Sequence, residues 1–210
     1  ALSVINRALA GYTLTLTSAV NPYGNFGAGY QSTVSFGNFY MFNVTGSSAS
    51  SGAIIQFLKL NLKNIGAPTV NYGLIAFGTE SANILHKTMD CVFNLNGRVT
   101  SGIRLNAAGT IAQVFNCVMV NTDKTISSAG ILTILSSTSS IFENNTVYNC
   151  KYGLLNYGNN AYTAKNIACF DNSFDYVYAN SGISGLGNTV ASKCASSDTT
   201  GSEAGLRSLV

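Results

Sequence analysis

The stretch from Phe142 to Cys194 writes one short pattern three times. Asn145-Thr146-Val147, Asn166-Ile167-Ala168 and Asn188-Thr189-Val190 each begin with asparagine and continue with strand-forming residues, and they recur after 21 and 22 residues. A fixed period of this length is typical of stacked structural repeats. Looser versions of the pattern lie upstream, for example around Cys117, so the repeat covers more than the last third of the chain.

Two further series of short apolar runs accompany the asparagine series. One begins at Gly73, Gly102, Gly130 and Gly153, and the other precedes each asparagine or cysteine strand, as at 84–86. Each repeat therefore holds three short strands and three turns, which need roughly 21 to 27 residues. A coil that returns above its own start pairs each strand with the same strand of the next coil. The sequence predicts an all-β fold, a right-handed single-stranded parallel β-helix of about five to seven coils.

The remaining segments set the expected boundaries. We expect an N-terminal cap and first strands over 1–50, with a short capping helix at 3–11, then the β-helix over 51–194 and a C-terminal tail over 195–210. No helix-length amphipathic segment separates the strands, which excludes a βαβ sheet. An antiparallel sandwich or jelly roll remains the second choice, although Asn96-Gly97 is the only Asn-Gly or Asp-Gly hairpin signal.

The repeat gives its asparagines and aliphatic residues structural roles. Asparagine tolerates the left-handed conformation that a tight bend between strands requires. Stacked coils would bring these asparagines into a hydrogen-bonded ladder, and inward aliphatic residues into a second stack. The predicted ladder and stack residues are Asn145, Asn166, Asn188, Val147, Ile167 and Val190.

Composition limits the partners and the chemistry. Charged residues make up 9% of the 210 residues, the net charge is +3, and the basic residues are scattered. This distribution argues against nucleic acid and membrane surfaces as partners. The five cysteines lack the spacing of a metal site. We interpret them as small apolar core residues, with disulfides between neighbouring coils as the alternative, and we expect no metal and no other cofactor.

A resemblance to a known family rests on three stretches and the tail. The stretches are Phe142-Glu-Asn-Asn-Thr-Val-Tyr-Asn-Cys150, Lys165-Asn-Ile-Ala-Cys169 and Gly187-Asn-Thr-Val190, followed by Ser196-Ser-Asp-Thr-Thr200. They resemble right-handed parallel β-helix repeat proteins of the pectin-lyase-like superfamily, especially forms of tailed bacteriophages, over about residues 54–200. Members of that family include polysaccharide lyases and hydrolases, tailspikes that cleave or bind glycans, and virion surface proteins without catalysis. The fold does not choose among them.

The catalytic groups that such enzymes need are not evident. Glycoside hydrolysis requires two carboxylates that flank the scissile bond. Asp171 and Asp175 are expected on a bend that faces solvent, and Asp90 and Glu143 lie two coils apart. His86, the only histidine, is interpreted as polar surface. We assign no catalytic residue.

Aromatic residues are the remaining candidates for a binding surface. Five tyrosines fall on two adjacent coils: Tyr152, Tyr157, Tyr162, Tyr176 and Tyr178. On one outer face they would stack on sugar rings or pack against a neighbouring subunit. Packing is favoured, because outward charge is sparse.

The resemblance and the missing catalytic groups together favour a non-enzymatic structural protein of a phage virion. It would decorate or cement the capsid, or form a tail or fibre module, at the virion surface and hence outside the cell. The expected partners are copies of itself, with a trimer as one arrangement, and other virion proteins, with a host surface glycan as a further ligand. The alternatives are a glycan depolymerase of the tailspike type and a carbohydrate-binding module.

Overall fold

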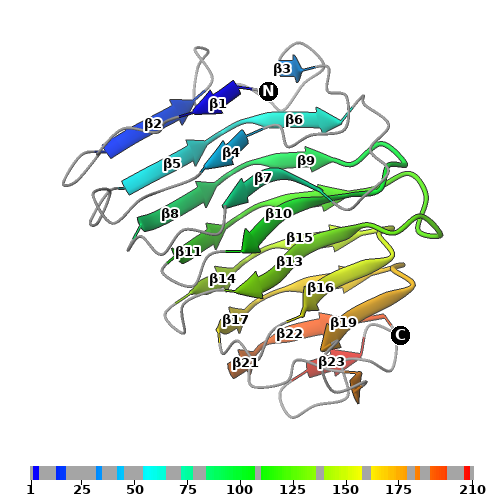
Figure 1. Cartoon of the computed structure of the whole chain (residues 1–210). Helices are drawn as coiled ribbons and strands as arrows, with labels where there is room; N and C mark the ends of the chain where they lie inside the picture. Colours follow the sequence, from blue (N-terminus) through cyan, green and yellow to red (C-terminus); the bar gives the residue numbers. More distant parts are fainter. Residues whose placement is uncertain are drawn as a thin grey trace.

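The structure, a computed structural model, consists of three β-sheets wound around one core (Figure 1). It describes residues 2–4, 13–17, 32–34, 42–44, 54–64, 72–77, 84–106, 110–135, 140–157, 162–178, 183–184, 190–197 and 206–208. Within these ranges the chain passes repeatedly from sheet A to sheet B to sheet C.

The strands of each sheet follow one another along the stack. Sheet A contains β1 (Leu2–Val4), β4 (Phe42–Val44), β7 (Tyr72–Phe77), β10 (Thr100–Asn106), β13 (Ala129–Leu135), β16 (Tyr152–Asn156), β19 (Phe174–Tyr178) and β20 (Ile183–Ser184). Sheet B contains β2 (Thr13–Thr17), β5 (Ile54–Leu58), β8 (Ile84–Met89), β11 (Thr110–Phe115), β14 (Ile141–Glu143), β17 (Thr163–Lys165) and β21 (Val190–Ser192). Sheet C contains β3 (Ser32–Val34), β6 (Asn61–Asn64), β9 (Val92–Asn94), β12 (Val118–Val120), β15 (Thr146–Tyr148), β18 (Ala168–Phe170), β22 (Cys194–Ser196) and β23 (Leu206–Ser208).

Strand pairing identifies the architecture. Neighbouring strands are parallel within all three sheets, and the one antiparallel pair among the described residues is β19 with β20. Four successive turns, β7–β9, β10–β12, β13–β15 and β16–β18, make the chain an all-β parallel solenoid of about four turns. The parallel β-helix expected from the repeat is confirmed, and an antiparallel sandwich is excluded for these residues.

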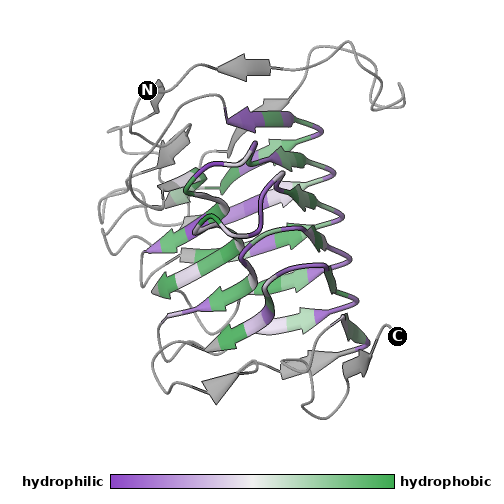
Figure 2. Ribbon diagram, turned by 90° about the vertical axis from the view of Figure 1, so that its right-hand side faces the viewer, coloured by the Kyte–Doolittle hydropathy of each residue, from purple (hydrophilic) through white to green (hydrophobic). Residues whose placement is uncertain are grey.

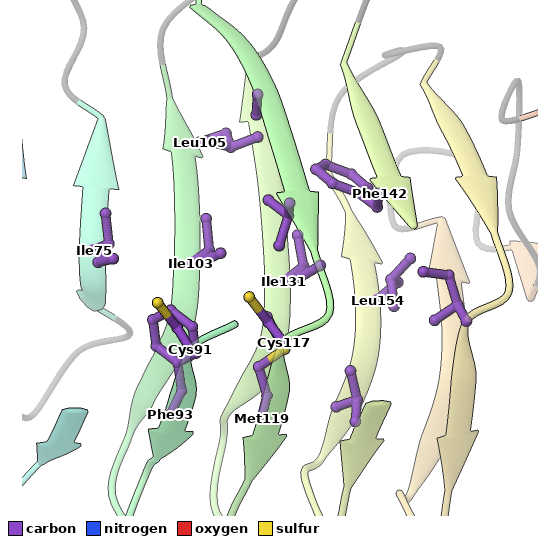
Figure 3. Close-up of a cluster of buried hydrophobic side chains, with 14 of the residues drawn as sticks. Ile75, Cys91, Phe93, Ile103, Leu105, Cys117, Met119, Ile131, Phe142 and Leu154 are labelled. Carbon is purple, nitrogen blue, oxygen red and sulfur yellow. The ribbon is translucent and has the colours of Figure 1, made fainter. Parts of the chain in front are cut away.

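The core follows from the period-two alternation of the strands. Ile75, Ile103, Ile131 and Leu154 pair in register across sheet A, and each is at most 1% exposed. Figure 3 shows these side chains in a row on successive strands. The same apolar bands recur on successive strands in Figure 2. Full burial of each such side chain contributes roughly 1.5 to 3 kcal/mol, so the stack stabilises every turn through its neighbours.

The predicted aliphatic stack has a different membership. Val147 lies between Met119 and Cys169 in sheet C, and Val190 is paired with Thr163 in sheet B. Ile167 lies in the turn between β17 and β18. Val147, Ile167 and Val190 therefore occupy three different columns. The predicted alignment matched Asn145 to Asn166, whereas the constant offset of 22 residues between these coils makes Asn144 equivalent to Asn166, and Val190 begins a strand of sheet B.

The corner between sheets B and C is built the same way in every described turn. The first residue after the sheet B strand has φ between 51° and 56° at Lys59, Asp90, Asn116, Asn144, Asn166 and Lys193. Asparagine and aspartate tolerate this left-handed region better than other non-glycine residues. The tight bend predicted from the asparagine series is present at this corner.

The asparagine ladder is present, but it contains Asn144 where the prediction placed Asn145. Asn116 donates to Asp90 Oδ1 (3.1 Å), Asn144 donates to Asn116 Oδ1 (3.2 Å), and Asn166 donates to Asn144 Oδ1 (2.9 Å). Asn145 is instead the second residue of its turn, and Asn188 lies outside the described residues. Of the three predicted ladder positions, Asn166 is in the ladder.

The residue that follows each left-handed corner residue points into the core. This column consists of Leu60, Cys91, Cys117, Asn145, Ile167 and Cys194, all buried. Asn145 is held there because its Oδ1 accepts from the Cys117 amide (2.9 Å) and its Nδ2 donates to the Val114 carbonyl (2.9 Å). All five cysteines are free and buried. Burial raises the pKa of Cys150 to about 12, which suits small apolar core residues.

The glycine series lies where sheet A approaches sheet C. A Cβ at Gly130 would lie 2.5 Å from Val147 Cγ1, and one at Gly153 would lie 2.8 Å from Cys169 Sγ, both in sheet C. These glycines therefore permit a close approach that any side chain would block.

The predicted N-terminal helix does not start at Ser3. Leu2–Val4 form strand β1, which is paired in parallel with Phe42–Val44, while the rest of the predicted helix, 5–11, lies outside the described residues. The described part of the chain contains no helix, and hence none long and apolar enough to cross a membrane.

Candidate functional site: an aromatic ridge

The corner between sheets C and A carries two of the three exposed aromatic side chains among the described residues, Tyr148 and Phe174. Four aromatic side chains flank two successive turns here, 149–151 and 171–173, and we call them together the aromatic ridge: Tyr148, Tyr152, Phe170 and Phe174. Tyr148 and Phe170 are register partners on the outer side of sheet C, and Tyr152 and Phe174 are register partners in sheet A.

Both pairs join residues of successive coils, and the Tyr152–Phe174 pair is stacked. The ring centroids of Tyr148 and Phe170 are 5.0 Å apart with a 37° tilt, and those of Tyr152 and Phe174 are 5.8 Å apart and nearly parallel at 19°. The residues keep substantial exposed area, 37% for Tyr148 and 43% for Phe174. Lys151 Nζ lies 5.5 Å from the Tyr152 ring centroid, where the ring face attracts the ammonium.

A longer turn from an earlier coil packs against the two turns that the ridge residues flank. Within 121–128, Lys124 pairs with Asp171 (2.5 Å), and the Lys124 carbonyl accepts from Ser173 Oγ (2.9 Å). Asn149 Nδ2 also donates to the Asn121 carbonyl (3.1 Å). These contacts fix the backbone of both turns that carry the aromatic pairs.

The ion pair lowers the pKa of Asp171, which lies in one of the two turns that the ridge residues flank. The Lys124 ammonium holds the pKa of Asp171 below its ordinary value, and the Tyr148 hydroxyl contributes in the same direction. Asp123 also has a lowered pKa, because the Thr125 hydroxyl and amide donate to it. Both carboxylates are therefore ionised at neutral pH, and each is held by neighbouring groups.

A polar cluster beneath the ridge corrects the expectation for Asp175. Instead of facing solvent, its carboxylate is fully buried and accepts from Asn172 Nδ2 (2.8 Å), Ser196 Oγ (2.9 Å) and the Ser197 amide (2.6 Å). Asn172 Oδ1 in turn accepts from the Cys150 amide (2.8 Å). Asp175 thus joins coils within the interior and is separated from its exposed neighbour Asp171.

The five predicted tyrosines do not share one face. Tyr162 is buried against Phe142, with ring centroids 4.8 Å apart. Tyr176 is also buried, and its hydroxyl donates to the carbonyls of Ile167 (3.2 Å) and Ala195 (3.0 Å).

Two of the four tyrosines whose side chains are described are accessible. Tyr157 is 51% exposed at the far end of β16 from the ridge, and Tyr152 belongs to the ridge. The side chain of Tyr178 lies outside the described residues.

Tyr148, Phe170 and Phe174 are binding candidates that were not predicted from the sequence. A signal for them exists, because Tyr148 and Phe170, like Tyr152 and Phe174, are separated by 22 residues, the repeat period. The prediction considered tyrosines alone, whereas the fold pairs each exposed tyrosine of the ridge with a phenylalanine of the next coil.

His86 is an interior residue rather than polar surface. It is fully buried in β8, its Nε2 lies 2.6 Å from Thr88 Oγ1, and its ring meets the Phe57 ring edge-on at 5.7 Å. Burial lowers the pKa of His86 to about 3, so the ring is neutral at physiological pH. His86 is therefore a structural residue of the core.

The other carboxylates considered for catalysis are also engaged. Asp90 caps the asparagine ladder, and Glu143 accepts from Lys165 Nζ (2.8 Å) in the next coil. Within the described residues no group of three or more His, Cys, Asp or Glu side chains could hold a metal ion. The ridge itself offers flat aromatic faces and one cation. It is suited to binding rather than to acid–base chemistry.

Comparisons with known proteins give no family for this fold and site. The chain matches no protein-family model, no curated protein and no solved structure.

Proposed function

We propose that the protein is a non-enzymatic structural protein of a phage virion. In this proposal a right-handed solenoid of five to seven coils forms a rigid body at the virion surface, as a capsid decoration protein or as a tail or fibre module. Its partners are copies of itself and other virion proteins.

The proposal that the protein is not an enzyme is supported by the structural contacts of its described carboxylates. Each described acid has a partner that stabilises the coils or turns: Asp90 with Asn116, Asp123 with Thr125, Glu143 with Lys165, Asp171 with Lys124, and Asp175 with Ser196. A glycosidase instead needs two carboxylates aimed at one bond. The viral part is supported by the resemblance of the repeat to phage β-helix proteins and by the low surface charge.

Two measurements test the two parts separately. Virus-like particles purified by density from the source material should contain the tryptic peptide 105–124 at constant ratio to the major capsid protein across the particle peak. A peptide that stays in the soluble fraction overturns the viral assignment.

Incubation of the purified chain with bacterial polysaccharides should release neither reducing ends nor unsaturated uronates. Either product would establish the depolymerase alternative.

A carbohydrate-binding module is the second candidate, and the aromatic ridge favours it. Stacked, partly exposed rings present apolar faces of the kind on which sugar rings pack. If the ridge binds glycan, Tyr152→Ala and Phe174→Ala should each abolish retention on a glycan array. Tyr157→Ala is the matched control, because Tyr157 is more exposed yet lies outside the ridge. Equal loss in all three variants, or no retention of the wild type, would remove this candidate.

A further inference from the structure

Two buried cysteines occupy equivalent places in successive coils at the corner between sheets B and C. Cys91 follows Asp90, Cys117 follows Asn116, and both are free thiols in the inward column of that corner. Their backbones are held together from both sides, because the Val118 amide donates to the Cys91 carbonyl (3.0 Å) and Asn116 Nδ2 donates to Asp90 Oδ1 (3.1 Å). The two cysteines are therefore nearest neighbours along the column.

The two thiols also contact each other. Figure 3 shows both sulfur atoms on the same side of the column, in neighbouring coils. Cys117 Sγ leans towards the coil of Cys91, where it lies 3.6 Å from the Thr88 carbonyl oxygen. A hydrogen bond from the Cys117 thiol lowers the pKa of Cys91, whereas burial raises the pKa of Cys117. Cys91 therefore becomes a thiolate more readily, and the thiolate is the form that attacks a disulfide.

The spacing of the coils suits a covalent bond between these sulfurs. Neighbouring strands of a sheet lie about 4.8 Å apart, and disulfides join Cα atoms that are about 4.4 to 6.8 Å apart. The Cβ atoms of a disulfide are closer, at about 3.5 to 4.5 Å, so the two coils must approach slightly as the bond forms. Such a bond is strained, and strained disulfides are reduced more easily than ordinary structural ones.

No other two cysteines have this arrangement, and all five lie within the described residues. Cys169 has Val147 and Ser196 as its neighbours along sheet C. Cys194 shares the inward corner column but lies three coils beyond Cys117, and Cys150 lies in the corner between sheets C and A. Coil register therefore selects one pair out of the five cysteines.

We propose that Cys91 and Cys117 form a reversible disulfide that fastens the coil β7–β9 to the coil β10–β12. The oxidant is a small-molecule disulfide such as oxidised glutathione. The Cys91 thiolate attacks one sulfur of that disulfide and expels a thiolate, and the Cys117 thiolate then attacks the Cys91 sulfur and expels the second. Two protons and two electrons leave the protein, and the oxidised glutathione becomes two thiols. Because both sulfurs are buried, the exchange takes place when the corner opens or before it closes during folding.

The pairing is tested by peptide mapping, since trypsin places every cysteine in a different peptide. The reduced full-length chain is refolded in a mixture of oxidised and reduced glutathione, the remaining thiols are alkylated, and the digest is analysed without reduction. The peptide 88–98, which contains Cys91, should be joined to 105–124, which contains Cys117, and the other three cysteines should be alkylated. Alkylation of all five cysteines, or a different pair as the main linkage, overturns the proposal.

Alanine variants test whether coil register selects the pair. Cys150→Ala removes a cysteine outside the pair and should still give the linkage between 88–98 and 105–124. Cys91→Ala should leave all four remaining cysteines alkylated, because Cys117 then has no neighbouring thiol. Both are scored on chains with a near-native circular dichroism spectrum. If Cys117 joins another cysteine in the Cys91→Ala chain as efficiently as it joins Cys91 in the wild type, register does not choose the partner and the proposal is wrong.

Reversibility is tested on the bridged protein. Excess reduced glutathione should return Cys91 and Cys117 to alkylatable thiols while the circular dichroism spectrum stays native, as expected of a strained bond. A linkage that survives this treatment in the folded chain and opens only in denaturant would be a permanent structural disulfide, which contradicts the reversible link proposed here.

Discussion

Two corners of the same solenoid obey different rules. Between sheets B and C, every described turn places one left-handed residue first and, apart from the last, one buried residue second. Between sheets C and A, the turns range from three residues at 149–151 to eight at 121–128. The uniform corner keeps the coils in register, whereas the variable corner tolerates insertions and carries the aromatic ridge. Fold and surface chemistry are thus encoded on different edges of one repeat.

The largest expected effect comes from a buried group behind the uniform corner. Asn145→Ala leaves the Cys117 amide and the Val114 carbonyl buried without their present side-chain partner. Each such group costs about 1 to 3 kcal/mol, so the free energy of unfolding should fall by about 2 to 6 kcal/mol in urea titrations. Ser173→Ala in the variable corner removes one exposed hydrogen bond and is the control. If the two variants lose the same stability, the contrast between the corners is wrong.

The next effect is a loss of stability in acid caused by His86, which lies on the strand leading into the uniform corner. The pKa of this ring is about 3 in the folded chain and about 6.5 when unfolded. Between these values the unfolded chain binds a proton that the folded chain does not, so stability is fully present above pH 6.5 and falls as the pH drops towards 3. At pH 4 the loss should be about 3 kcal/mol relative to pH 7.

His86→Gln supplies the comparison for that pH dependence. The glutamine side chain does not titrate, so its unfolding free energy should vary less between pH 7 and 4 by about the same 3 kcal/mol. Denaturant titrations at five pH values measure the difference. Parallel pH profiles for the two proteins would show that other groups cause the acid loss.

A smaller effect should separate conformation from hydrogen bonding in the ladder. Asn144 has φ of 56° and bonds both Asn116 and Asn166. Asn144→Gly loses those exposed hydrogen bonds, but glycine adopts the left-handed conformation without strain. Asn144→Ala loses the same hydrogen bonds and also strains the backbone, so it should lower the free energy of unfolding by roughly 1 kcal/mol more. Thermal unfolding of the two variants measures this gap. Equal melting temperatures would mean that the bend does not depend on an αL-tolerant residue.

The two corners also explain what the sequence could predict. The period of the asparagine and glycine series is enough to predict three strands per coil, because each coil must return to a position above the coil before it. It did not suffice for the ladder register, since Asn144 and Asn145 are adjacent and both look like ladder residues. Only the backbone separates the left-handed first position from the buried second one. The aromatic ridge was missed for a related reason: Tyr162 and Tyr176 resemble Tyr152 in type but alternate to the inner face.

The smallest effect is expected at the ion pair that ties the 121–128 turn to the ridge. The side chains of Lys124 and Asp171 are 42% and 49% exposed, so their attraction is screened by solvent and should add little to global stability. Lys124→Ala should leave the melting temperature unchanged, while amide hydrogens of 121–128 exchange faster and the pKa of Asp171 rises towards its ordinary value. Salt at about 1 M should reproduce both local changes in the wild type, because it screens the pair. A drop in melting temperature as large as that of Asn144→Ala would mean that the variable corner also maintains coil register, and the division between the two corners would have to be abandoned.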